Sequence, residues 1–301
     1  MSSAKTRRPA PARRPFGNHT VLAVVIAAVA AVAIGVAAIV WFAGRAEEGP
    51  GGEAAVDLAH VHGLGINPAN GLLYAAAHTG LYQLPTAAAA TRVGTGEQDT
   101  MGFTVVGPNH FLASGHPASH AGGPAHLGLL ESTDGGVSWR ELSLRGGADF
   151  HALRYRHGLV YGYNSTTGEL LVSADKTTWE TRSTTPLRDF AVDPADADGL
   201  LATTEQGLAR SADGGRTWTA TGEPALLLDW TATGALWAVA VDGTVRHSTD
   251  SARAWSTRGS VPGTATAFAA DGENLYVAVA DRGVLHSSDG GQKWTQLYPR
   301  P

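Results

Sequence analysis

The sequence contains no cysteine among its 301 residues. This absence excludes disulfide bonds, thiolate metal sites, a cysteine nucleophile and a lipid-modified N-terminal cysteine. Charged residues are also sparse, at 16% of the chain, whereas glycine is abundant, with 38 residues. Low charge with many glycines is typical of an all-β protein rich in turns. Its stability must come from packing and from closure of the fold.

No charged residue occurs between Val21 and Gly44. As a helix, this run is long enough to span about 30 Å of hydrocarbon. Basic residues precede it and Glu47 and Glu48 follow it, which favours a cytoplasmic N-terminus. We therefore predict a basic cytoplasmic tail (1–20), a single transmembrane helix acting as a signal anchor (21–44), a flexible linker (45–56) and an extracytoplasmic domain (57–301). A cleaved signal peptide is the alternative, although its apolar region is usually only about 7–15 residues long.

The part of the chain after Arg45 has few basic residues. It contains 16 lysines and arginines against 27 acidic residues, a net charge of −11. Such a domain is unsuited to binding nucleic acid. The partners we expect are the membrane, through the anchor, and a small polar ligand, a glycan or an envelope protein. The high alanine, glycine and arginine content with little lysine favours a bacterial source with a GC-rich genome.

An eight-residue motif recurs between residues 132 and 294, as STDGGVSW at 132–139, SADGGRTW at 211–218 and SSDGGQKW at 287–294. Two degenerate copies fill the gaps. The copy at 248–255 has Ala252 in place of the second glycine, and the copy at 173–179 is one residue short. The five motif tryptophans are therefore spaced 37 to 40 residues apart. About 40 residues is the period of a four-stranded propeller blade.

This period predicts an all-β fold, a single β-propeller with six blades of four antiparallel strands. The predicted blades are 57–97, 98–146, 147–185, 186–222, 223–260 and 261–301. We expect each motif to form the turn between the third and fourth strands of its blade, because aspartate accepts hydrogen bonds from turn amides and glycine adopts positive φ. The tryptophan that ends the motif should bury its ring between neighbouring sheets.

The motif resembles the Asp box, or bacterial neuraminidase repeat, of sialidases, sortilin-type receptors, photosystem II assembly-factor propellers and exported bacterial glycosyl hydrolase-like proteins. The resemblance implies that the repeated residues are structural and lie on the blade periphery. These residues are Asp134, Trp139, Asp175, Trp179, Asp213, Trp218, Asp250, Trp255, Asp289 and Trp294. Sialidases also use an arginine trio, and the sequence shows no matching arginine pattern, so a true sialidase is not expected.

Candidate functional residues should lie where first strands begin and second strands end, because both positions face one mouth of a propeller channel. The carboxylates expected there are Asp99, Asp149, Asp189, Asp229 and Glu205. Two of them about 5–9.5 Å apart would suit a glycoside hydrolase. The alternative is that they bind backbone amides at the inner edge of each blade.

Histidines supply a second set of candidates, since nine of the twelve fall between His60 and His157. The predicted ligand-binding residues are His60, His62, His78, Asp99, His116 and His151. Imidazole and thioether groups are suitable ligands for copper or zinc. The predicted metal ligands are His62, His78, His116 and His151 with Met101. The alternative is that these histidines only form hydrogen bonds inside a polar channel.

The leading hypothesis is a membrane-anchored extracytoplasmic β-propeller that binds a metal ion or a small polar ligand at a His- and Asp-rich channel mouth. The first alternative is a glycosyl hydrolase-like enzyme acting on glycans through the channel carboxylates. The second is a non-catalytic scaffold for protein interactions. All three share one fold, because a fold does not determine a function.

Overall fold

The computed structural model describes residues 58–299, except for 59 and 86–88. The predicted cytoplasmic tail (1–20), transmembrane helix (21–44) and linker (45–56) lie outside the described residues. Within the described ranges, no helix has the length and apolar character needed to cross a membrane.

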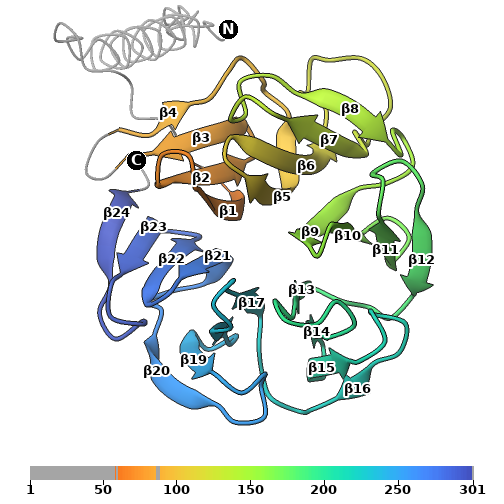
Figure 1. Cartoon of the computed structure of the whole chain (residues 1–301). Helices are drawn as coiled ribbons and strands as arrows, with labels where there is room; N and C mark the ends of the chain where they lie inside the picture. The colour runs from red at the N-terminus through yellow and green to blue at the C-terminus, as the bar shows by residue number, and fades with distance from the viewer. Residues whose placement is uncertain (1–57, 59, 86–88, 300–301) are drawn as a thin grey trace, which may run out of the picture. The chain divides into compact units, whose positions relative to one another are not determined.

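Six four-stranded antiparallel sheets surround a central axis (Figure 1). Blade 1 contains β1 (Val61–Asn67), β2 (Leu72–Ala77), β3 (Gly80–Leu84) and β4 (Thr91–Arg92). Blade 2 contains β5 (Asp99–Gly107), β6 (His110–His116), β7 (Leu129–Ser132) and β8 (Arg140–Ser143). Blade 3 contains β9 (Phe150–Arg156), β10 (Leu159–Asn164), β11 (Glu169–Ser173) and β12 (Glu180–Ser183).

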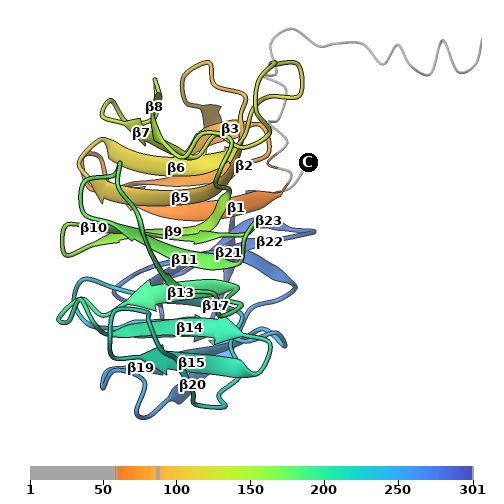
Figure 2. The same cartoon turned by 90° about the vertical axis from the view of Figure 1, so that its right-hand side faces the viewer.

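The other half of the ring repeats this plan. Blade 4 contains β13 (Asp189–Val192), β14 (Leu200–Thr204), β15 (Gly207–Ser211) and β16 (Thr219–Ala220). Blade 5 contains β17 (Leu227–Trp230), β18 (Leu236–Val239), β19 (Thr244–Ser248) and β20 (Ser256–Ser260). Blade 6 contains β21 (Ala265–Asp271), β22 (Asn274–Val279), β23 (Gly283–Ser287) and β24 (Thr295–Pro299). Figure 2 views the ring from its edge, with blades 3 and 4 toward the reader.

The six-bladed propeller predicted from the repeat is confirmed. Every blade takes all four strands from one continuous stretch of chain, and its first strand is innermost (Figure 1). The core consists of six separate apolar clusters, each between two neighbouring blades. One of them packs Leu64 and Ala75 of blade 1 against Ala267 and Ala278 of blade 6. This packing, rather than a strand exchanged between the first and last blades, closes the ring.

The repeated motifs form the turns between third and fourth strands, as predicted. In blade 2 the Ser132 hydroxyl donates to Asp134 Oδ1 at 2.7 Å and accepts from the Gly136 N–H at 2.8 Å. Asp134 Oδ1 also accepts from the Ser138 N–H at 3.0 Å. The same serine-to-aspartate bond occurs in the motifs of blades 3 to 6. Each turn is therefore held by one carboxylate that binds the backbone ahead of it.

The motif tryptophans connect neighbouring blades. The Trp179 indole N–H of blade 3 donates to the Ser143 hydroxyl of blade 2 at 3.0 Å. The Trp218 N–H of blade 4 donates in the same way to Ser183 of blade 3, at 3.1 Å. Each ring also packs partly buried against an apolar cluster. Trp179 and Trp218 thus contribute both apolar area and blade-to-blade hydrogen bonds.

Candidate functional site

The inner strands of blades 1, 2 and 3 share an irregularity at the same place. In each, the register to the second strand shifts near the start of the inner strand, and the residue left out of the pairing is His62 in β1, Met101 in β5 and His151 in β9. Such β-bulges redirect side chains and are common beside functional sites. Three potential metal-ligand side chains therefore occupy equivalent positions on neighbouring blades.

Glycine lets these inner strands approach one another. A Cβ atom added at Gly63 would lie 2.9 Å from the Phe103 Cβ of the next blade. A Cβ at Gly102 would likewise collide with the backbone oxygen of Phe150. Because Gly63 follows His62 and Gly102 follows Met101, the tight approach lies directly beside the bulges.

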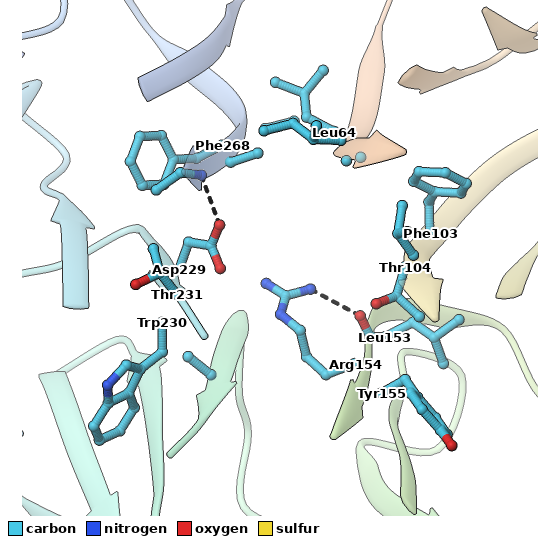
Figure 3. Close-up of a pocket in the computed structure, with 18 of the residues that line it drawn as sticks. Leu64, Phe103, Thr104, Leu153, Arg154, Tyr155, Asp229, Trp230, Thr231 and Phe268 are labelled. Carbon is cyan, nitrogen blue, oxygen red and sulfur yellow. Dashed lines mark hydrogen bonds between the residues drawn. The ribbon is translucent and has the colours of Figure 1, made fainter. Parts of the chain in front are cut away.

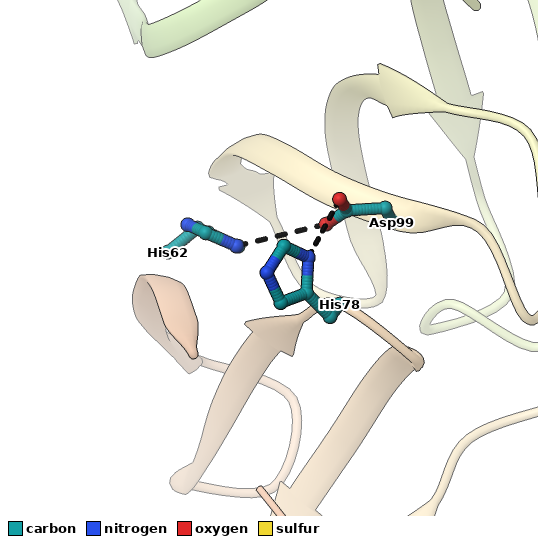
Figure 4. Close-up of side chains that lie close together, drawn as sticks. All are labelled: His62, His78 and Asp99. Carbon is teal, nitrogen blue, oxygen red and sulfur yellow. Dashed lines mark ion pairs between the residues drawn. The ribbon is translucent and has the colours of Figure 1, made fainter. Parts of the chain in front are cut away.

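The first candidate site, here the His62 group, joins blades 1 and 2 and comprises His62, His78 and Asp99 (Figure 4). His78 follows the end of β2, and its Nδ1 lies 2.6 Å from Asp99 Oδ2. His62 Nε2 lies 3.6 Å from Asp99 Oδ1. Both of these facing atoms are buried and neither has a hydrogen-bond partner among the described residues. The group therefore has a nitrogen and a carboxylate oxygen that face each other at ion-pair distance without a hydrogen bond.

The second candidate site, here the His151 group, joins blades 2 and 3 and comprises His116, Asp149 and His151. Asp149 Oδ2 lies 2.8 Å from His151 Nε2 and 3.5 Å from His116 Nε2. The Ser165 hydroxyl donates to the same oxygen at 3.0 Å. Asp149 Oδ1 is buried and has no hydrogen-bond partner in the described part of the chain.

A backbone carbonyl orients one imidazole of the His151 group. His116 Nδ1 lies 3.0 Å from the Ala125 carbonyl oxygen, which can only accept a hydrogen bond. A neutral His116 must then carry its proton on Nδ1, so that the lone pair of Nε2 points toward Asp149. This arrangement of an imidazole between a carbonyl and a ligand site is typical of histidines that bind metals.

Burial keeps the His62 imidazole neutral. Burial lowers the pKa of His62 to about 4, an effect that Asp99 opposes and that His78, His151 and His60 reinforce. A neutral imidazole has the free lone pair that metal binding requires. The influence of His151 on His62 also indicates that the two groups lie in one neighbourhood.

The second carboxylate is held in its charged form. Burial tends to raise the pKa of Asp149, but the hydrogen bond from His151 and the charges of His151 and His116 outweigh that effect, and the pKa is lowered. An ionised carboxylate is the form that ligates a cation.

Two further histidines adjoin the groups, since the His60 ring lies 4.9 Å from that of His78 and the His126 ring lies 5.4 Å from that of His116.

A cavity of about 860 Å³ occupies the centre of the ring, and His62, Met101 and His151 line it together. Arg154 of β9 extends into this cavity (Figure 3). Arg154 was not among the residues predicted to line the channel. The available signal was its position as a charged residue in the middle of an inner strand.

The other three predicted carboxylates do not join these groups. Asp189 and Asp229 line the central cavity, and each accepts a hydrogen bond from the next blade, from the N–H of Leu228 at 2.9 Å and of Ala270 at 2.7 Å. Glu205 lies in the exposed turn between β14 and β15. The alternative interpretation, that inner carboxylates bind backbone amides, therefore describes Asp189 and Asp229.

The predicted metal ligands are divided between two places. His62 and His78 belong to the first group, and His116 and His151 belong to the second. All four were predicted to form one set with Met101, because an alignment of the blades does not reveal that each carboxylate pairs with a histidine of the preceding blade. The available signal was a shared spacing. Asp99 stands two residues before the bulge residue Met101, and Asp149 stands two residues before the bulge residue His151.

No protein-family model matches the sequence, and no curated protein matches it. Solved β-propellers resemble the structure. The GH74 enzyme of Niastella koreensis is 17% identical at a TM-score of 0.55, over 80% of this chain and 37% of that one. The GH74 xyloglucanase of Xanthomonas campestris is 17% identical at a TM-score of 0.51, over 80% and 46%. YCF48 bound to a D1 peptide is 17% identical at a TM-score of 0.50, over 80% and 82%.

These similarities concern the fold. This chain spans less than half the length of each of these two GH74 proteins. Identity of 17% shows a shared propeller architecture, and the function must be argued from the side chains of this chain.

Proposed function

We propose that this protein is a membrane-anchored, extracytoplasmic β-propeller that binds a transition-metal ion, copper or zinc, at the His62 and His151 groups. The observation that carries the proposal is the pair of buried, unbonded atoms His62 Nε2 and Asp99 Oδ1. Buried polar atoms are nearly always hydrogen-bonded, and unsatisfied ones call for an explanation such as an ion.

The separation of these two atoms fits a bridging ion. Ligand atoms about 2.0–2.2 Å from a tetrahedral ion stand about 3.3 Å apart. His62 Nε2 and Asp99 Oδ1 are 3.6 Å apart, which is too long for a hydrogen bond and close to that ligand spacing. A small inward movement of either side chain would complete the coordination.

The ligand chemistry favours copper or zinc over magnesium or calcium. Each group offers two imidazoles and one carboxylate, with ligand atoms within 4.8 Å of one another. Imidazole suits zinc and copper, whereas magnesium and calcium prefer sites made of oxygen atoms. The neutral His62 and the ionised Asp149 are already in the protonation states that metal binding needs.

Metal analysis and calorimetry of the full chain in detergent test the proposal. We expect wild-type protein to bind Zn²⁺ or Cu²⁺, and the double variant His62→Ala/His78→Ala to lose one binding event. The matched control is His247→Ala/His286→Ala, because these histidines stack on Trp237 of blade 5 and Tyr276 of blade 6, away from the candidate groups. Equal binding by all three proteins would refute a metal site at the His62 group.

The anchor is part of the proposal and needs its own test. The charge-free segment 21–44 behind a basic tail is its support. We expect the full chain to remain in membranes after an alkaline wash and to be released by detergent. A chain lacking residues 1–44 should appear in the wash, and retention of that shortened chain would contradict anchoring by this segment.

A glycoside hydrolase remains the second candidate because the fold resembles GH74 propellers. Among the described carboxylates of the cavity, however, Asp189 and Asp229 bind backbone amides of the next blade, and Asp189 also pairs with Arg154. These contacts give both residues a structural use. Turnover of fluorogenic glycosides that is lost in Asp189→Asn and Asp229→Asn, yet kept in His62→Ala/His78→Ala, would favour the enzyme.

A further inference from the structure

The two candidate metal groups have a similar arrangement of residues. The first joins blades 1 and 2, and the second lies one blade further along, between blades 2 and 3. In each, a histidine at or directly after the end of the second strand meets the carboxylate that precedes the bulge of the next blade. These pairs are His78 with Asp99, at 2.6 Å, and His116 with Asp149, at 3.5 Å. The shared plan makes positions in one group equivalent to positions in the other.

The two groups take their third ligand from opposite blades. In the first group it is the bulge residue of the earlier blade, His62, and in the second it is the bulge residue of the later blade, His151. Each group therefore has one bulge position that its three ligands leave unused. In both groups the unused position is the bulge of blade 2.

Met101 occupies that common position. It is half-buried and lines the same cavity as His62 and His151, and its strand β5 lies between β1 and β9 (Figure 1). Its side chain has three rotatable bonds and a polarisable sulfur atom. Such a side chain can turn toward either neighbour.

We propose that Met101 is a shared fourth ligand, which gives the two groups a site for Cu(I) and allows the ion to pass between them. This inference rests on the proposed metal binding and adds the identity of the ion. A thioether is a soft ligand that selects Cu(I), whereas zinc binds well to imidazole and carboxylate alone. Because one sulfur atom cannot serve two ions at once, the first Cu(I) should bind more tightly than the second.

Competition with a chromophoric Cu(I) chelator under anaerobic, reducing conditions tests this inference on the full chain. We expect Met101→Leu to weaken the first Cu(I) by about tenfold or more and to bring the two Cu(I) affinities together. Zn²⁺ affinity should change by less than about threefold, since leucine keeps the volume of the side chain. Met101→His should strengthen Zn²⁺ binding and remove the preference for Cu(I).

Selenomethionine substitution supplies a direct readout. The chain has two methionines, Met1 and Met101. X-ray absorption at the selenium edge of the Cu(I)-loaded protein should show a copper neighbour, and the signal should disappear in Met101→Leu.

The outcomes separate this inference from the proposed function. A wild-type protein that binds no Zn²⁺, Cu²⁺ or Cu(I) would overturn both. A protein that binds these ions, with unchanged Cu(I) affinity in Met101→Leu and no copper neighbour at selenium, would overturn the role of Met101 alone.

Discussion

Nη2 of Arg154 lies 2.7 Å from Oδ1 of Asp189, so that an ion pair joins the inner strands of blades 3 and 4. The other oxygen of Asp189 accepts the N–H of Leu228 in blade 5 at 2.9 Å. One carboxylate therefore holds three successive blades in place around the cavity.

Replacing this carboxylate should destabilise the propeller. We expect Asp189→Asn to lower the free energy of unfolding by about 1–3 kcal/mol, because it removes a charged hydrogen bond and leaves Arg154 without its counter-charge. Chemical denaturation followed by tryptophan fluorescence measures the change. Stability equal to wild type would show that the ion pair contributes nothing net.

Asp229 offers a matched comparison, because replacing it should not lower the free energy of unfolding at pH 7 as the replacement of Asp189 does. Burial raises the pKa of Asp229, so its ionised form lowers the stability of the folded state. The stability that the protonated form contributes is therefore lost as the pH rises through the folded pKa. Asparagine keeps an oxygen for the Ala270 N–H. We expect Asp229→Asn to match or exceed wild-type stability at pH 7 and to lose that advantage near pH 4. A loss at pH 7 as large as that of Asp189→Asn would contradict this account.

Most of the fold could be predicted from the sequence, because the repeated motif determines the turn that it forms. Each motif contains the serine, aspartate and tryptophan that form the turn and open the next strand, so six blades and their phase followed from spacing. The first blade lacks the motif, yet the range predicted for it, 57–97, contains all four of its strands, β1 to β4.

The candidate site could be predicted only in part. The enrichment of histidine in blades 1 to 3 is visible in the sequence, but the bulges at His62 and Met101 arise from pairing between strands and leave no simple signature. The roles of Asp189 and Arg154 depend on contacts across blades more than 30 residues apart. Such contacts are set by ring closure, which no local pattern encodes.

The motif tryptophans allow a test of the hydrogen bonds between blades. The Trp179 N–H donates to Ser143, whereas the buried N–H of Trp294 has no partner in the described part of the chain. Both changes to phenylalanine lose ring volume, but only Trp179→Phe also loses a hydrogen bond. We expect Trp179→Phe to cost about 0.5–1.5 kcal/mol more than Trp294→Phe in denaturation measurements. Equal losses would assign the whole effect to packing.

Acid should weaken the motif turns. Hydrogen bonds from the Ser138 hydroxyl and N–H hold the pKa of Asp134 at about 2, below its value in an unfolded chain, and the pKa values of Asp175, Asp213, Asp250 and Asp289 are lowered in the same way. A depressed pKa contributes stability that is complete above about pH 5 and is lost as pH falls toward the folded value.

We therefore expect the urea midpoint of the metal-free protein to fall steadily between pH 5 and pH 2. The difference in stability between wild type and Asp134→Asn should be largest above pH 5 and should shrink as the pH falls. A difference that stays constant over this range would show that the turn depends on packing rather than on the carboxylate charge.

The close approach of the inner strands should link stability to metal binding. An alanine methyl at Gly63 would lie 2.9 Å from the Phe103 Cβ, so β1 and β5 would have to separate. We expect Gly63→Ala to cost about 1–3 kcal/mol, as overpacked cores do. Because His62 precedes Gly63 and Asp99 begins β5, the same movement would lengthen the 3.6 Å gap that the ion is proposed to bridge.

The control for this substitution lies in β5, the inner strand that Gly63 faces. A Cβ atom at Gly107, at the other end of β5, meets no atom within 4 Å. Gly107→Ala should change stability by less than about 0.5 kcal/mol and leave Zn²⁺ affinity unaltered. Calorimetric titration of both variants, together with their urea midpoints, measures the two effects side by side. If Gly63→Ala kept wild-type Zn²⁺ affinity while losing stability, strand spacing would not control the His62 group.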